Sequence, residues 1–232
     1  MTFTAALAAV RARIEMAATA AGRDPATIRL LAVSKTFPAE LVREAVLAGC
    51  TDLGESRVQE LTAKAQALAD LDPRWVLIGP LQTNKARDVA RVAHEVQTLE
   101  RVEVAQALQR RLETADRTLD VLLQVNTSRE PEKSGVTPAD LLALAAEVAR
   151  FDRLHIRGLM TIATRGGDDV ETRRCFSELA QLQGRLREEA IEGVVADDLS
   201  MGMSGDLEIA IEQGATTLRV GGALFGARPS VT

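Results

Sequence analysis

The chain has 232 residues, of which 46% are hydrophobic and 3% aromatic, and its formal net charge is −5. This composition argues against a nucleic-acid partner, since a phosphate backbone needs clustered lysine and arginine, and single strands need aromatic stacking platforms. No stretch approaches the roughly 20 uninterrupted apolar residues that cross a bilayer, so we expect a cytoplasmic protein without a membrane partner. The length favours one domain over residues 1–232.

Strand-like and helix-like segments alternate along the whole chain. Residues 1–22 combine apolar positions with Arg11, Arg13 and Glu15, which predicts an amphipathic helix. Short apolar runs then alternate with longer segments of helical period. The predicted strands are residues 30–35, 50–55, 75–79, 95–100, 120–126, 155–162, 197–202 and 216–222. This order predicts an α/β fold, a single (β/α)8 TIM-like barrel with an extra N-terminal helix.

The two cysteines indicate neither a disulfide nor a metal site. Cys50 and Cys175 lie far apart in segments of helical pattern. Neither has a Cys or His partner at metal-ligand spacing. We therefore expect two reduced, structural thiols and no metal.

Polar residues follow several predicted strands, at the ends that meet on one rim of a barrel. Lys35 directly follows the apolar run 30–33, so its amine is expected near the barrel axis. Partial desolvation there favours the neutral amine that attacks a carbonyl. A lysine that merely ends a strand, with its amine in solvent, is the alternative. The irregular segment 126–135 is interpreted either as a lid over this rim or as a solvated loop.

A second polar cluster lies after the seventh and eighth predicted strands. It consists of Ser200, Gly202, Ser204, Gly205, Gly221 and Gly222. Open backbone N–H groups bind phosphate, and barrels often hold phosphate after these two strands. Turn glycines with Ser204 or Asp206 as a helix cap explain part of the pattern. Arg219 shares a strand face with Gly221, and its buried partner is predicted to be a cofactor ring nitrogen or a carboxylate.

A set of motifs runs in one order along nearly the whole chain. They are LLAVSKTFP, GESRVQE, WVLIGPLQTNK, KSG, RGLMTI, LSMGMSGDLEIAIEQG and RVGGALFGAR. Together they resemble the family of pyridoxal phosphate homeostasis proteins, whose fold is similar to the N-terminal barrel of alanine racemase. The resemblance implies that the chain binds pyridoxal 5'-phosphate (PLP), buffers this reactive aldehyde and delivers it to apo-enzymes.

The resemblance also assigns roles to individual residues. The implied cofactor-binding residues are Lys35, Ser56, Asn84, Met160, Ser200, Met201, Arg219, Gly221 and Gly222. Lys35 would form the internal aldimine, a Schiff base, with PLP. The phosphate would be held by Ser200, Met201, Gly221 and Gly222. Arg219 would face the pyridine nitrogen. Asn84 and Met160 would line the pocket, with Lys133 as a basic residue over its entrance.

Three positions depart from the family's pattern. Ser56 stands where the second-strand motif usually has asparagine, and Gly222 stands where threonine commonly follows the last-strand glycine. Val76 occupies a position at which histidine is frequent. The lysine and the phosphate cradle are retained, so the resemblance implies altered PLP contacts rather than lost binding.

The composition favours a carrier over an enzyme. Racemisation through PLP needs a base on each face of the α-carbon, and alanine racemase supplies a tyrosine from a second domain. This chain has no tyrosine and ends at Thr232, soon after the eighth predicted strand. His94 and His155 begin predicted strands, which places them on the face of a barrel concerned with stability. We expect a non-catalytic, monomeric PLP carrier with no catalytic residues.

Two enzymatic alternatives are left open by the residues. One is a PLP-dependent amino-acid racemase or decarboxylase of the alanine-racemase-like barrel type. The other is an aldolase-like barrel in which Lys35 attacks a sugar phosphate held by the cluster around Ser200 and Gly221.

Overall fold

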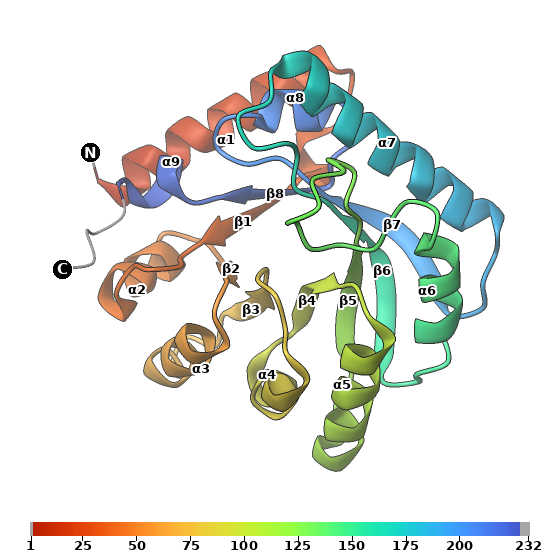
Figure 1. Ribbon diagram of the computed structural model, residues 1–232. Helices are drawn as coiled ribbons and strands as arrows, with labels where there is room; N and C mark the ends of the chain where they lie inside the picture. Colours follow the sequence, from red (N-terminus) through yellow and green to blue (C-terminus); the bar gives the residue numbers. More distant parts are fainter. Residues whose placement is uncertain (1, 228–232) are drawn as a thin grey trace.

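A closed barrel of parallel strands forms the centre of the computed structural model, which describes residues 2–227 (Figure 1). The strands follow one another around the barrel in chain order, and β1 pairs with β8 to close it. They are β1 (Arg29–Val33), β2 (Asp52–Glu55), β3 (Arg74–Leu77), β4 (Glu95–Leu99), β5 (Leu119–Gln124), β6 (Leu154–Met160), β7 (Val194–Ser200) and β8 (Thr217–Val220). The predicted (β/α)8 barrel is confirmed.

Helices form the outer layer around the barrel (Figure 1). The α-helices are α1 (Phe3–Ala20), α2 (Ala39–Leu47), α3 (Val58–Ala67), α4 (Ala86–Val92), α5 (Val102–Ala115), α6 (Leu141–Val148), α7 (Asp169–Glu188), α8 (Leu207–Glu212) and α9 (Gly222–Phe225). Two 3-10 helices, η1 (Pro25–Thr27) and η2 (Thr83–Lys85), lie in the connections. Among the helices within residues 2–227, none is long and apolar enough to cross a membrane.

The extra N-terminal helix is present as α1. The Thr2 hydroxyl caps it by accepting a hydrogen bond of 3.3 Å from the N–H of Ala5. Its apolar face is buried and packs against α8 and α9, as Figure 1 shows. At this contact the ring of Phe225 lies 5.0 Å from that of Phe3 and 5.1 Å from that of Phe37. The helix therefore supports the chain that leaves β1.

The predicted strands are found, with ends shifted by up to three residues. The largest shift is in β7, which begins at Val194 rather than at residue 197 and ends at Ser200 rather than at residue 202. Val194 follows Gly193, whose φ of 80° ends the preceding turn. Gly202 has a φ of 87°, which turns the chain away from the sheet. Cys50 precedes β2 instead of lying in a helix, and both cysteines are buried free thiols, as expected.

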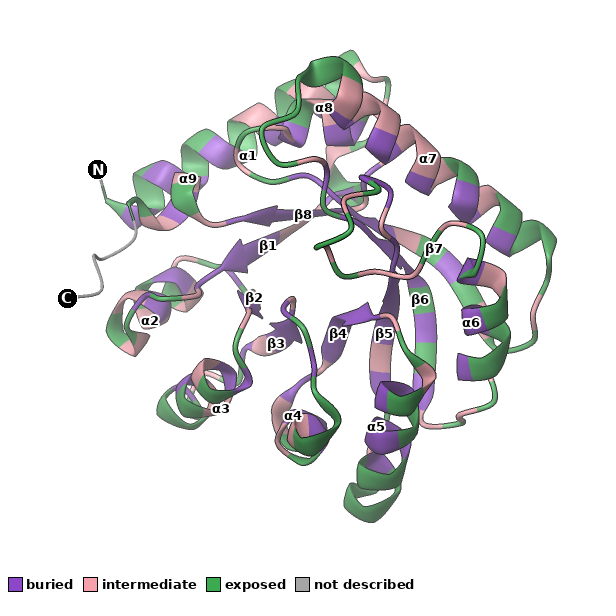
Figure 2. Cartoon of the chain, in the orientation of Figure 1, coloured by how far each residue is buried: buried purple, intermediate pink, exposed green. Residues whose placement is uncertain are grey.

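The interior of the barrel carries charged side chains at its amino end. Figure 2 shows that the strands are mostly buried, whereas the helices expose their outer faces. Arg29 donates two hydrogen bonds of 2.8 Å to Glu95, and Arg74 donates one of 2.8 Å to Asp120. Barrel interiors are usually filled with branched apolar side chains, so this ion cluster is a departure from the common pattern.

Candidate functional site

A cavity of about 330 Å³ lies at the carboxyl ends of β1 and β8. It is lined by Val33, Lys35, Phe37, Ile78, Ile162, Met203, Ser204, Gly205, Arg219, Gly221 and Gly222. Its volume falls within the range of about 300–1,000 Å³ that small-molecule sites occupy. The cavity brings together four of the cofactor-binding residues that the family resemblance implies, together with Ser204 and Gly205 of the second polar cluster.

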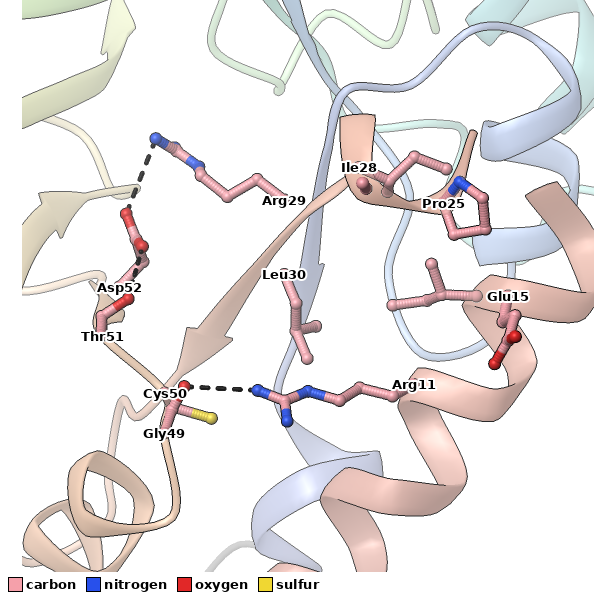
Figure 3. Close-up of a pocket in the computed structure, with 12 residues that line it drawn as sticks. Arg11, Glu15, Pro25, Ile28, Arg29, Leu30, Gly49, Cys50, Thr51 and Asp52 are labelled. Carbon is pink, nitrogen blue, oxygen red and sulfur yellow. Dashed lines mark hydrogen bonds and ion pairs between the residues drawn. The ribbon is translucent and has the colours of Figure 1, made fainter. Parts of the chain in front are cut away.

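Two larger hollows lie elsewhere on the molecule, but neither is lined by the residues predicted from sequence to bind a cofactor. One of about 470 Å³ lies near the amino ends of β1 and β2, beside α1 (Figure 3). There Arg29 points toward Asp52, and Arg11 donates a hydrogen bond of 3.3 Å to the carbonyl of Gly49. Another, of about 510 Å³, is bounded by side chains of α1, α7 and α8. Neither contains Lys35, and barrel sites for chemistry lie at the carboxyl ends of the strands.

Lys35 sits in a tight turn immediately after β1. The N–H of Phe37 donates a hydrogen bond of 3.2 Å to the carbonyl of Ser34, which closes the turn around Lys35 and Thr36. Lys35 is half-buried and lines the cavity. The turn therefore places Lys35 on the rim of the barrel, at the carboxyl end of β1.

Arg219 brings a buried positive charge to the same cavity. Its side chain donates hydrogen bonds of 2.7 Å to the Ser200 hydroxyl and 2.7 Å to the carbonyl of Thr161. Desolvation by burial lowers the pKa of Arg219 to about 10, although the more distant Asp206 carboxylate opposes the shift. The guanidinium therefore stays protonated at neutral pH. Within residues 2–227 no carboxylate lies within 4.0 Å of it, so the structural ion pair considered from sequence is not formed.

Glycines keep one side of the cavity open. A Cβ added at Gly205 or at Gly222 would meet no heavy atom within 4 Å, so these positions face free space. Gly221 is more confined, because a Cβ there would lie 3.1 Å from the carbonyl oxygen of Val33. Ser204 stands between the two loops and accepts a hydrogen bond of 3.3 Å from the N–H of Ala223. Backbone N–H groups of these loops can thus approach a ligand closely.

Five of the residues implied by the family resemblance do not line this cavity. The Ser200 hydroxyl is buried beneath it, and Met160 and Met201 are fully buried in the packed interior. Ser56 is half-buried after β2, and its carbonyl oxygen packs closely against Gly79. Asn84 is exposed on η2. Their roles toward a cofactor stay predictions, whereas Lys35, Arg219, Gly221 and Gly222 share one cavity.

Sequence reasoning missed part of the cavity wall. Phe37, Ile78, Ile162 and Met203 supply its apolar surface, and none had been proposed as a site residue. Ile78 and Ile162 could have been found, because both lie at the carboxyl ends of predicted strands, 75–79 and 155–162. Met203 carries no such signal, since its position depends on the turn at Gly202.

A chain of hydrogen bonds connects Arg219 with the ion cluster at the opposite end of the barrel. Ser200 Oγ accepts from Arg219 and donates to Gln97 Oε1 at 2.7 Å. Gln97 Nε2 donates to Glu95 Oε1 at 2.6 Å, and Glu95 also accepts from Arg29. The hydroxyl of Ser200 thus has a donor and an acceptor within the protein. Because both hydrogen bonds point into the barrel, the Ser200 hydroxyl does not face the cavity.

The segment 126–135 packs back onto the rim of the barrel. Val125 pairs with Val136, and Lys133 Nζ donates a hydrogen bond of 2.7 Å to the carbonyl of Ala163 and pairs with Glu130. Lys133 lines a separate hollow of about 260 Å³, which shares the side chains of Ile78 and Ile162 with the cavity at Lys35. The segment therefore borders the neighbouring hollow rather than the cavity at Lys35 itself, and the lid interpretation stays a prediction.

The histidines and cysteines lie away from the cavity. His94 Nδ1 accepts a hydrogen bond of 3.1 Å from the N–H of Trp75 at the amino end of the barrel, and burial lowers the pKa of His94. His155 lies near the start of β6, 3.7 Å from Asp120. Both positions agree with the prediction of a structural role. Within residues 2–227, no three His, Cys, Asp or Glu side chains are grouped so that they could hold a metal ion.

Comparisons with known proteins agree with this geometry. Residues 6–229 match the family model of the alanine racemase N-terminal domain. The pyridoxal phosphate homeostasis protein of Pseudomonas aeruginosa is 47% identical over 222 residues, which covers 96% of this chain and 94% of that protein. PipY of Synechococcus elongatus, solved with PLP bound, is 35% identical and superimposes with a TM-score of 0.85 over 97% of this chain and 100% of that chain.

A more distant structural likeness concerns the fold alone. Alanine racemase of Clostridium difficile superimposes with a TM-score of 0.71 at 14% identity. The match covers 88% of this chain but only 53% of the racemase. The shared part is therefore the barrel.

Proposed function

Because the chain belongs to the family of pyridoxal phosphate homeostasis proteins, we propose that it binds PLP at the cavity around Lys35 and acts as a non-catalytic carrier of that cofactor. The observation that supports this most directly is that an amine, in the turn after β1, and a buried guanidinium, on β8, line the same cavity. PLP carries an aldehyde, which condenses reversibly with amines, and a phosphate. The cavity offers a group suited to each part of such a molecule.

The residues present fit this cofactor. Lys35 lies at one side of the cavity, where its amine can take the aldehyde. Elsewhere in its lining, Ser204 and the open positions at Gly205 and Gly222 leave room for a phosphate among hydroxyl and N–H groups. Arg219 lines the same cavity, and its guanidinium can donate to a ring nitrogen. Ser204 thereby takes the place beside the phosphate that the family resemblance gave to Ser200.

The carrier role is supported by the scarcity of further bases. The chain has no tyrosine, and His94 and His155 both lie at the amino end of the barrel, away from the carboxyl-end cavity. With Lys35 as the one amine lining the cavity, a racemase would lack a base for the opposite face of its substrate. We further propose that the protein releases PLP to apo-enzymes.

The experiment that tests this proposal maps the attachment site. The chain has only four lysines, Lys35, Lys64, Lys85 and Lys133. Protein mixed with PLP and reduced with borohydride should carry a single adduct on the peptide that contains Lys35, as seen by mass spectrometry. Lys35→Ala should remove the adduct, and the control Lys85→Ala should retain it. No adduct, or an adduct spread over the other lysines, would contradict the proposal.

A second measurement separates the carrier from the racemase. The protein loaded with PLP is incubated with a panel of amino acids in D2O, and exchange at the α-carbon is followed by NMR. A carrier should give little exchange above the background of free PLP. Exchange that is well above background and lost in Lys35→Ala would favour the enzyme instead.

A further inference from the structure

The turn that carries Lys35 is strained. Thr36 has a φ of 71°, a conformation that is unfavourable for a β-branched residue. In a turn closed between Ser34 and Phe37, a positive φ at the third residue is the signature of a type II turn, which usually has glycine there. Such strain persists only where the surrounding structure holds it, and it concentrates at functional sites.

Helix α3 holds this turn on both sides of Lys35. The N–H of Thr36 donates a hydrogen bond of 2.7 Å to Glu60 Oε2. Lys64 Nζ donates a hydrogen bond of 2.8 Å to the carbonyl of Ser34. Glu60 and Lys64 are one helical turn apart, and their side chains also pair at 3.4 Å. The two peptide groups that flank Lys35 are therefore fixed by charged side chains of the same helix.

A buried carboxylate completes the arrangement. Glu55 at the end of β2 has no exposed surface, and its Oε1 accepts from the Ser34 hydroxyl at 2.6 Å and from Lys64 Nζ at 2.6 Å. Its other oxygen is buried without a hydrogen-bond partner. A buried ion pair that is incompletely satisfied is a poor source of stability. Its retention next to a strained turn indicates a role in local geometry.

We propose that Glu60 and Lys64, backed by Glu55, are positioning residues that hold the Lys35 amine in the direction from which it attaches to an aldehyde. This inference rests on the proposed function. Lys64 is not itself an alternative attachment point, because its three donors each have an acceptor, in Ser34, Glu55 and Glu60. The arrangement thus explains both the orientation of Lys35 and the selection of one lysine over the buried lysine beside it.

The test compares PLP with pyridoxine 5'-phosphate, which has an alcohol in place of the aldehyde and so cannot attach to an amine. Glu60→Ala removes the acceptor for Thr36. We expect it to weaken PLP binding roughly 10- to 100-fold, the range that corresponds to one lost hydrogen bond to a charged acceptor. Binding of pyridoxine 5'-phosphate should stay at the wild-type value, because the groups proposed to hold the phosphate belong to the loops after β7 and β8.

Two further variants make the result specific. Glu60→Gln keeps an oxygen that can accept from Thr36 and should restore most of the PLP affinity. Gln59→Ala changes an exposed neighbour on the same helix and should have no effect on either ligand. Lys64 is left intact, since its removal would strand the buried charge of Glu55.

The outcomes separate this inference from the proposed function. Selective loss of PLP binding in Glu60→Ala, with rescue by Glu60→Gln, would support the inference. Equal losses for both ligands, or no loss for either, would overturn it while leaving PLP binding by the wild type intact. A wild-type protein that bound neither ligand would overturn the proposed function and this inference with it.

Discussion

Gln97 is the link on which the hydrogen-bond chain inside the barrel depends. It is fully buried, accepts from Ser200 at 2.7 Å and donates to Glu95 at 2.6 Å. Gln97→Leu keeps a side chain of similar size and removes both bonds. We therefore expect this substitution to destabilise the barrel, although it introduces an apolar side chain into a buried position.

The expected loss of stability follows from the polar groups that lose a hydrogen-bond partner in Gln97→Leu. The Ser200 hydroxyl loses its acceptor, which costs about 1–3 kcal/mol for a buried polar group. Glu95 loses one bond to a charged group, worth about 1.5–3 kcal/mol, but it keeps the two bonds from Arg29. Part of this loss is offset by burial of the leucine. The net cost should be roughly 2–4 kcal/mol, a large share of the roughly 5–15 kcal/mol that a domain has available.

A matched substitution on α7 should not destabilise the protein. Gln183 is also buried, at 7% exposure, but its Nε2 has no hydrogen-bond partner. Gln183→Leu removes an unsatisfied donor and should be neutral or stabilising. Urea unfolding of both variants at constant m value gives the comparison. A Gln97→Leu protein as stable as wild type, or equal losses in the two variants, would refute the reasoning.

Two further predictions concern pH and the segment 126–135. Burial alone would raise the pKa of Glu95, but its bonds and charge pairing with Arg29, together with Gln97 and Arg74, outweigh burial and lower it. The stability that Glu95 contributes is therefore present above the ordinary glutamate pKa and lost as the pH falls through the lowered value. The difference in urea midpoint between wild type and Glu95→Gln should shrink in acid, and an undiminished difference would contradict this. Gly135 has a φ of 126°, and a Cβ there would lie 2.6 Å from the nitrogen of Asn126, so Gly135→Ala should expose the segment to proteolysis. Gly166→Ala, at a φ of 70° with free space around it, is the control; equal cleavage in both variants would point to backbone strain alone.

The fold and half of the cavity were accessible from sequence because both depend on local periodicity. Strand and helix patterns predicted the barrel, and a barrel places the carboxyl ends of all its strands on one rim. Lys35, Arg219 and Gly221 could therefore be placed together without knowledge of any contact between them. The shared strand face of Arg219 and Gly221 follows from the alternation of side chains along a strand, and Lys35 follows from its place just after a predicted apolar run.

Strand and helix patterns could not show which of the two serines, Ser200 or Ser204, faces the cavity. The two serines are four residues apart in one motif, and either could face a phosphate. The strand continues through Ser200, and the positive φ of Gly202 then turns the chain so that Ser204 reaches the cavity. The contacts of Gln97 with Ser200 and of Lys64 with Ser34 were equally inaccessible, since they join segments that are remote in sequence. Only the alternation of Glu95 and Gln97 with Val96 in a predicted strand indicated a polar interior.

Arginines inside the barrel have different partners at its two ends. At the amino end, Arg29 and Arg74 are matched by carboxylates within 2.8 Å, so their charges are compensated by the protein itself. At the carboxyl end, Arg219 is more deeply buried, yet its hydrogen bonds go only to neutral oxygens. A buried charge without a counter-charge is costly, and the same strands supply carboxylates elsewhere. The contrast within one barrel favours a ligand, rather than the folded chain alone, as the partner that Arg219 is arranged to meet.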